Sequence, residues 1–195
     1  MYLNESDPRI LAILDAAFRV FISYGFRRTT MDDIARAAGM SRPALYTHFR
    51  NKEAIFRAYA ELLRDRVLAE ARAYLAAPGP IGDALAETLE IAYLRPYRAL
   101  IETPHGVELI GVNKEIAGDV HTGWLTGVED MLADWLSGEQ ADGRLAFGAI
   151  APRAVARFVV NATEGIKSRD QDLDRASAEV ALMAQMLARA YSPRR

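Results

Sequence analysis

Residues 29–52 constrain the fold more than any other part of the chain, because their local signals fix the ends of two helices. Thr30 can cap a first short helix, with Asp33 three residues later as its capping-box partner. Gly39 suits the left-handed conformation that ends a helix, and Ser41 can cap the helix that follows. The segment therefore predicts two short helices joined by a turn of about three residues.

Side-chain size in this segment indicates how the two helices pack. Ala35 and Gly39 are small enough to let the helices approach closely, and Leu45 of the second helix can fill the space between them. On a helical wheel, Leu45 and Phe49 point into this core. The opposite face of the second helix is polar and compact, and it consists of Pro43, Tyr46, Thr47 and Arg50, with Arg42 and His48 at its borders.

A polar helix face of this kind fits the major groove of duplex DNA. Side chains in the first turns of such a helix reach base edges, while donors beside them hold phosphates. Lys52, at the start of the next helix, adds a positive charge beside helix-terminal N–H groups, an arrangement that favours a phosphate oxygen. The pattern therefore indicates a DNA-binding helix-turn-helix.

The rest of the chain is also predicted to be helical. Ala, Leu, Arg and Glu dominate, and no stretch shows the sustained period-two alternation of a strand. A first helix begins near Pro8 and ends at Gly25, and a long helix runs from about Lys52 to Ala77. Five further helices are expected near residues 82–95, 107–120, 120–137, 152–167 and 174–191. The predicted fold is all-α, with a three-helix domain over residues 1–51 and a larger helical domain over residues 52–195.

Composition and charge limit the classes of function. The 195 residues include no cysteine, which excludes disulfide scaffolds, thiolate metal sites and cysteine nucleophiles. No apolar run approaches the roughly 18 residues of a membrane span, and the chain does not start with a signal-peptide pattern, so we expect a cytoplasmic protein without a membrane partner. The net charge of -2 does not suggest a nucleic-acid binder, but residues 1–66 carry a net charge of +3. Basic charge is concentrated at the end that carries the paired helices.

The paired helices resemble the DNA-binding domain of the tetracycline-repressor (TetR) family. The matching residues lie in roughly the first 65 positions and include Thr30, Ile34, Ala35, Ala38, Gly39, Ser41, Leu45, Tyr46, His48, Phe49, Asn51, Lys52 and Phe56. The resemblance implies a transcriptional regulator that represses by occluding a promoter. By position, it carries DNA-contacting roles over to Thr30, Ser41, Arg42, Pro43, Tyr46, Thr47, His48 and Lys52, with Thr47 and Arg42 as the base readers.

The resemblance also implies a near-palindromic DNA operator, a small organic effector and no cofactor. The candidate effector-binding residues lie on the central predicted helices and combine aromatic walls with polar anchors: Tyr93, Tyr97, His121, Trp124, Asn161 and Glu164. A homodimer is expected through an intermolecular four-helix bundle of the last two predicted helices. Its two apolar stripes are Val155, Phe158, Val159, Ala162 and Ile166, and Val180, Met183, Leu187 and Tyr191.

Three other interpretations remain open: a DNA-binding regulator without an effector, a helical enzyme, and a structural interaction protein. His105 and Glu108 lie one helical turn apart and His121 could fold nearby, but no HExxH pattern accompanies them. The sequence contains no GxGxxG, P-loop or GxSxG motif. We therefore predict no catalytic residue and no metal site. Each aromatic effector candidate has core packing as its alternative role.

Overall fold

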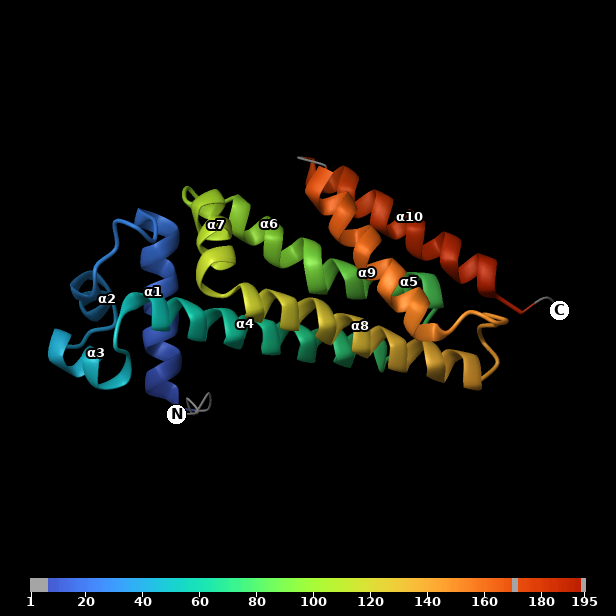
Figure 1. Cartoon of the computed structure of the whole chain (residues 1–195), viewed down its shortest axis with the longest axis horizontal. Coiled ribbons are helices and arrows are strands. Elements are labelled where there is room, and N and C mark those ends of the chain that lie inside the picture. Colours follow the sequence, from blue (N-terminus) through green and yellow to red (C-terminus); the bar gives the residue numbers. More distant parts are fainter. Residues whose placement is uncertain (1–6, 170–171, 194–195) are drawn as a thin grey trace. The chain divides into compact units, whose positions relative to one another are not determined.

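The structure is a computed structural model that describes residues 7–169 and 172–193. It is helical, and no strand occurs within these residues, so the predicted all-α fold is confirmed. Figure 1 labels the α-helices of the fold. The elements in chain order are α1 Pro8–Tyr24, α2 Met31–Ala37, α3 Arg42–His48, α4 Lys52–Leu75, α5 Ile81–Leu89, the π-helical turn η1 Glu90–Leu94, α6 Arg95–Ile101, α7 Gly106–Ile116, α8 Gly118–Ala141, α9 Pro152–Arg169 and α10 Leu173–Tyr191.

The chain forms two compact units. The first contains the described residues up to Asp65 together with Ala99–Thr122, and the second contains Arg66–Arg98 together with the described residues from Gly123 onward. The first unit therefore joins α7 to α1, α2 and α3, although α7 lies far from them in the sequence. The predicted domain boundary between residues 51 and 52 falls inside this first unit.

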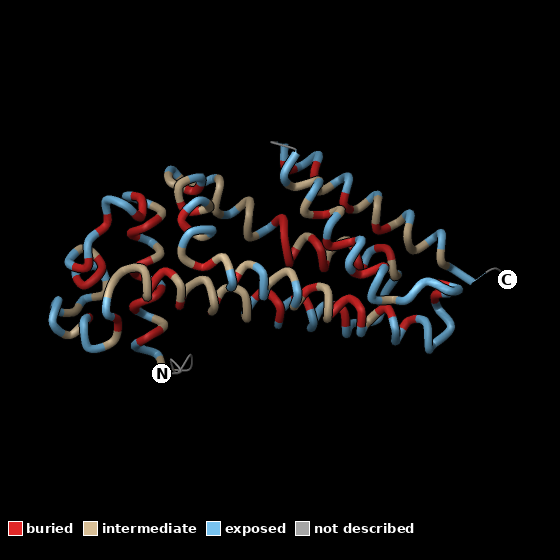
Figure 2. Tube along the Cα trace, viewed as in Figure 1, coloured by how far each residue is buried: buried red, intermediate tan, exposed pale blue. Residues whose placement is uncertain are grey.

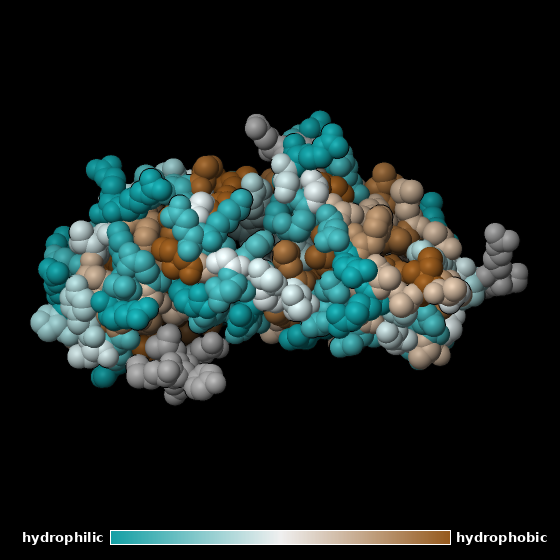
Figure 3. All heavy atoms as spheres, in the orientation of Figure 1, coloured by the Kyte–Doolittle hydropathy of each residue, from teal (hydrophilic) through white to brown (hydrophobic). Residues whose placement is uncertain are grey.

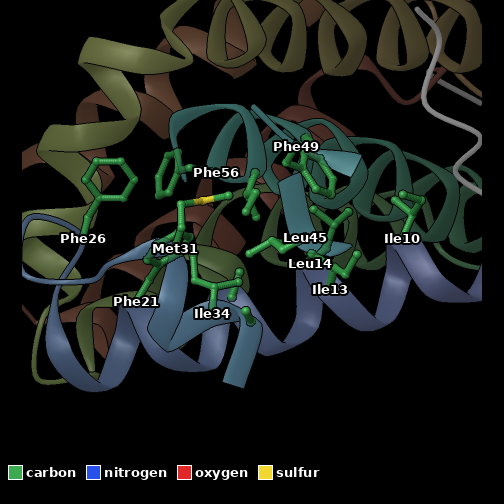
Figure 4. Close-up of a cluster of buried hydrophobic side chains, with 14 of the residues drawn as sticks. Ile10, Ile13, Leu14, Phe21, Phe26, Met31, Ile34, Leu45, Phe49 and Phe56 are labelled. Carbon is green, nitrogen blue, oxygen red and sulfur yellow. The ribbon is translucent and has the colours of Figure 1, made fainter. Parts of the chain in front are cut away.

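The core of the first unit is built from aromatic and aliphatic side chains of five helices. Phe21, Phe26 and Phe56 pack against one another, with ring centroids between 5.2 and 5.8 Å apart. Leu45 of α3 and Ile34 of α2 are fully buried in the same cluster, as Figure 4 shows. Leu109 and Val112 of α7 also belong to it. Burying each large side chain contributes about 1.5–3 kcal/mol, so this cluster fixes how the short helices α2 and α3 pack.

The π-helical turn η1 explains why the predicted helix near residues 82–95 continues to Ile101. Pro96 has no N–H group and cannot donate to the carbonyl of Ala92, four residues before it. The indole Nε1 of Trp124 donates to that carbonyl instead, at 3.0 Å. Within the widened turn, the N–H of Arg95 bonds to the carbonyl of Glu90, five residues back. The chain thus passes the proline without ending the helix.

The last two helices bury part of the surface that the sequence assigned to a dimer interface. Val155, Val159 and Val180 are packed inside the second unit, so they are not available to a partner and the prediction for them is corrected. Their side chains face inward because α9 and α10 pack against each other and against η1. Ala162, Ile166, Met183, Leu187 and Tyr191 are half-buried. Figure 2 shows these buried and exposed positions recurring along each helix.

The apolar residues that do face outward on these helices are few and large. Phe158 of α9 is 61% exposed, and Leu182 and Met186 of α10 are 59% and 62% exposed. The sequence predicted Phe158 but neither of the other two. Among the described residues, no helix is both long enough and apolar enough to cross a membrane.

We predict that Leu45→Ala lowers the free energy of unfolding by about 2–5 kcal/mol, because it leaves a cavity at a fully buried position. Urea denaturation followed by circular dichroism measures this change. Thr47→Ala, on the exposed face of the same helix, is the control and should leave the stability nearly unchanged. Equal effects of the two substitutions would contradict the packing of α3.

Candidate nucleic-acid interface

The helix-turn-helix is formed by the capping interactions that the sequence predicts. Thr30 Oγ1 accepts the N–H of Asp33 at 3.2 Å, and a carboxylate oxygen of Asp33 accepts the N–H of Thr30 at 2.9 Å. The hydroxyl of Thr30, which donates to the same carboxylate oxygen at 2.6 Å, and the backbone N–H of Thr30 lower the pKa of Asp33. Gly39 has a φ of 67°, which an L side chain rarely adopts, and Ser41 Oγ accepts the N–H of Ala44 at 3.3 Å. Both helices therefore have fixed N-termini before any ligand binds.

The exposed face of α3 has the composition that the helical wheel predicts. Leu45 and Phe49 are buried, whereas the side chains of Arg42, Pro43, Tyr46, Thr47 and Arg50 are exposed and His48 is half-buried. Thr30 and Ser41, at the N-termini of α2 and α3, are exposed as well. All eight predicted DNA-contacting residues are thus at least partly exposed, and Lys52, which is half-buried like His48, differs from the others in how its side chain is bound.

Two side chains of this face are already held together. The guanidinium of Arg42 donates to the hydroxyl of Tyr46 at 3.5 Å and lies 5.6 Å from the centre of its ring. The hydroxyl of Thr47 donates to the carbonyl of Ala44 at 2.7 Å, so its oxygen remains able to accept a hydrogen bond from a base. The face therefore offers donors from Arg42, an acceptor from Thr47 and an aromatic hydroxyl on a single helix.

Lys52 does not have the geometry of a phosphate ligand. Its ammonium donates to the carbonyls of Phe26, Arg27 and Thr29 at 2.7, 3.1 and 2.9 Å, and it lies 4.6 Å from the ring centre of Phe26. An ammonium has three N–H donors, and all three are used. The side chain therefore binds the loop between α1 and α2 to the start of α4. This geometry does not support the predicted phosphate contact.

Glu108 of α7 binds the same loop with a negatively charged carboxylate, which accepts a backbone N–H group, whereas Lys52 donates to backbone carbonyls. Its carboxylate accepts the backbone N–H of Arg27 at 2.9 Å, and its second oxygen lies 3.4 Å from Nδ1 of His105. Gly25 has a φ of 83°, and a Cβ at this position would lie 2.4 Å from the Glu108 carboxylate. Of the pair that the sequence placed one turn apart, Glu108 thus binds the backbone of the loop and His105 lies beside its carboxylate. The described residues contain no cluster of acidic or histidine side chains arranged to hold a metal ion.

Three exposed arginines near the helix-turn-helix had no predicted contact. Arg27 and Arg28 precede α2, and Arg50 follows α3. Arg28 also lines a groove of about 440 Å³ on the first unit, together with Tyr24 and Arg36. The net positive charge of the first 66 residues was the sequence signal for Arg27 and Arg28, whereas Arg50 was also placed on the predicted polar face. Positive charge of this kind strengthens binding to phosphates without selecting a base sequence.

Three of the six predicted effector-binding residues meet in the second unit. The ammonium of Lys167 lies 5.7 and 5.4 Å from the ring centres of Tyr93 and Tyr97, and it is 2.5 Å from a carboxylate oxygen of Glu164. The sequence analysis did not include Lys167, although Glu164 and Lys167 have the spacing of an ion pair on one helix face.

The other three predicted effector-binding residues have different surroundings in the structure. His121 belongs to the first unit, and Asn161 is exposed. Trp124 uses its indole N–H to bond the carbonyl of Ala92, which gives it a role in the fold. The cluster around Lys167 is therefore smaller than the set that the sequence predicted.

Together, the capped helix pair and the polar face of α3 define a helix-turn-helix domain of the DNA-binding class. Residues 13–59 match the family profile described as bacterial regulatory proteins, tetR family. The chain therefore matches that family over this N-terminal segment.

Similar proteins agree with this assignment. The HTH-type transcriptional repressor Rv1474c of Mycobacterium tuberculosis (strain ATCC 25618 / H37Rv) is 43% identical over 89 residues, which cover 41% of this chain and 47% of that protein. The match thus spans about half of that relative. The HTH-type transcriptional repressor ComR of Escherichia coli (strain K12) is 39% identical over 75 residues, which cover 37% of this chain and 36% of ComR.

Likeness to solved structures extends over the whole fold. A transcriptional regulator from Cytophaga hutchinsonii ATCC 33406 has a TM-score of 0.79 and 18% identity, with 96% of this chain and all of that chain covered. At this level of identity, the likeness shows the fold alone. The helical architecture beyond the matched segment is therefore also that of a known regulator.

We predict that Lys52→Met lowers the free energy of unfolding by about 1–3 kcal/mol, because three carbonyls of the α1–α2 loop lose a charged donor. Urea denaturation of the protein without DNA measures the change. Lys114→Met, at an exposed lysine of α7, is the matched control and should have little effect. A Lys52→Met protein as stable as the control would show that the lysine is free to serve as a phosphate ligand.

Proposed function

We propose that the protein is a dimeric transcriptional repressor that binds a near-palindromic DNA operator and responds to a small organic effector. The observation that carries this proposal is the exposed polar face of α3 on a helix pair whose ends are already capped. The similar proteins are named as transcriptional regulators, and no catalytic residue is proposed.

The proposed contacts divide into base-reading and backbone-binding groups. Arg42 and Thr47 read base edges, since they supply donors and an acceptor from the exposed face of α3. Tyr46 and His48 bind DNA phosphates next to those bases. Thr30, Ser41 and Pro43, which lie at the N-termini of α2 and α3, position the two helices on the DNA backbone. Lys52 is left out of this set, because its ammonium is bound to the α1–α2 loop.

The proposed dimer uses the outward side of the last two helices. Phe158, Leu182 and Met186 are large apolar residues that are more than half exposed, and such residues are typical of an interface centre. On the face drawn in Figure 3, hydrophobic residues gather toward the C-terminal end of the chain. Two copies related by a twofold axis would present two reading helices to two half-sites.

The proposed effector acts through the helical part beyond the helix-turn-helix. SmeT, the repressor of the multidrug efflux pump SmeDEF of Stenotrophomonas maltophilia, has been solved in complex with triclosan. That complex has a TM-score of 0.64 and 21% identity to this chain, with 95% of this chain and 92% of SmeT covered. Because α4 begins in the first unit and ends in the second, it is the proposed route by which the effector changes operator binding. A regulator that binds DNA without an effector is the second candidate, since Trp124 already has a partner within the fold.

We predict that the protein selects a near-palindromic duplex from random DNA and that Tyr46→Ala weakens binding to every duplex by about tenfold. Electrophoretic mobility shift measures the affinity at several salt concentrations, and the affinity should fall steeply as salt rises. Tyr74→Ala is the matched control, because Tyr74 and Tyr46 are 41% and 43% exposed. Substituting Thr47 should change the preferred base pairs instead. Failure to enrich any duplex would overturn the proposed function.

We predict that Phe158→Glu or Leu182→Glu converts a dimer into a monomer at micromolar concentration, because a charge cannot be buried unpaired at an interface. Multi-angle light scattering gives the molecular mass. Val107→Glu, at a valine of α7 that is 78% exposed, is the control and should leave the mass unchanged. A wild-type monomer, or a dimer that tolerates both charges, would contradict the proposed interface.

A further inference from the structure

Tyr93 carries a buried hydroxyl group that the fold does not use. The residue is 4% exposed, and its hydroxyl has no hydrogen-bond partner among the described residues. Burying a hydroxyl without a partner opposes folding, so native proteins rarely keep one without a reason. A phenylalanine would fill the same space without this cost.

The charges around Tyr93 keep this hydroxyl in its neutral form. Burial raises the pKa of Tyr93, and the carboxylates of Glu164 and Glu129 raise it further. Glu129 is paired with Arg153 at 3.0 Å, and Glu164 with Lys167 at 2.5 Å. The phenol therefore retains its proton and remains a hydrogen-bond donor at neutral pH.

Lys167 provides a second set of unused donors beside the same ring. Its side chain is only 14% exposed, and it lies over the rings of both Tyr93 and Tyr97. Among the described residues, Glu164 is the only hydrogen-bond acceptor of its ammonium, which leaves two of the three N–H donors available. A half-buried cation and the ring of a buried phenol thus lie close together, and each group keeps at least one donor without an acceptor among the described residues.

We propose that Tyr93 and Lys167 bind the carboxylate of an aromatic or otherwise apolar organic acid, whose body packs against Tyr97. One carboxylate oxygen accepts from the Tyr93 hydroxyl and the other from the Lys167 ammonium, so both unused donors gain a charged acceptor. This inference names the chemical class of the effector and rests on the proposed function.

The unused groups of the site are hydrogen-bond donors, so they select a carboxylate, which accepts, over an ammonium, which can only donate. Lys167 already occupies the position between two aromatic rings that a cationic ligand would seek, and like charges repel. The side chain of Glu164 is 25% exposed, so solvent screens its repulsion of a ligand carboxylate bound to the other N–H groups of Lys167.

The experiment uses the full chain and three probes of one shape: 1-naphthoate, 1-naphthamide and 1-naphthylmethylamine. Isothermal titration calorimetry measures their affinities, and we expect 1-naphthoate to bind about tenfold or more tightly than the amide, with the amine weakest. Lys167→Met should abolish the preference for the acid. Lys114→Met, at an exposed lysine, is the matched control and should keep it.

Tyr93→Phe separates a ligand-binding role from a structural one. This substitution should weaken 1-naphthoate binding by about tenfold while the melting temperature stays the same or rises, because it removes an unpaired buried hydroxyl. A lower melting temperature would show that the hydroxyl serves the fold, which would overturn its assignment to a ligand.

The outcomes distinguish this inference from the proposed function. Absence of 1-naphthoate binding near 1 mM, equal affinity for acid and amide, or an unchanged preference in Lys167→Met would each overturn the acid site. A mobility shift with the selected duplex tests the regulator independently. A protein that binds DNA but not 1-naphthoate retains the proposed function and loses the acid site, whereas one that binds 1-naphthoate but no DNA does the reverse.

Discussion

The contact between the Lys52 ammonium and three carbonyls of the α1–α2 loop connects the helix pair α2 and α3 to the long helix α4. The loop leaves α1 at Gly25 and reaches α2 at Met31, and the carbonyls of Phe26, Arg27 and Thr29 converge on one cation. Because that cation belongs to the first residue of α4, the position of α2 and α3 is tied to the start of the long helix. The carboxylate of Glu108 adds a tie from α7 to the same loop.

Sequence reasoning succeeded where the cause of structure was local. The boundaries of α2 and α3 follow from Thr30, Asp33, Gly39 and Ser41, whose partners lie within a few residues. It failed where the partner lies far along the chain. Lys52 bonds to carbonyls 23 to 26 residues away, and Glu108 bonds to an N–H 81 residues away, and neither contact has a spacing that a sequence pattern reveals.

Amphipathic stripes in the sequence predicted the helices of the second unit, but they did not predict which apolar residues of each stripe are buried by neighbouring helices. Val159 and Phe158 are adjacent in α9, yet the first is buried and the second is 61% exposed. A stripe that is about 100° wide can be divided between the core and the surface, and only the neighbouring helices decide where the division falls. The same limit applies to Pro96, whose helix continues because Trp124, 28 positions further along, supplies a donor to the carbonyl of Ala92.

The polar groups around Lys52 and those around Lys167 differ in how completely the fold satisfies their hydrogen bonds. The three donors of Lys52 all have acceptors within the fold, whereas Tyr93 and Lys167 retain donors without any. An effector changes operator affinity only by as much as it prefers one conformation over another. Two charge-assisted hydrogen bonds at these donors contribute about 1.5–3 kcal/mol each, so a conformation that lacks one of them binds an acid about tenfold or more weakly. The free energy of one such hydrogen bond, at Tyr93 or Lys167, is therefore large enough to couple binding of the proposed acid to operator binding.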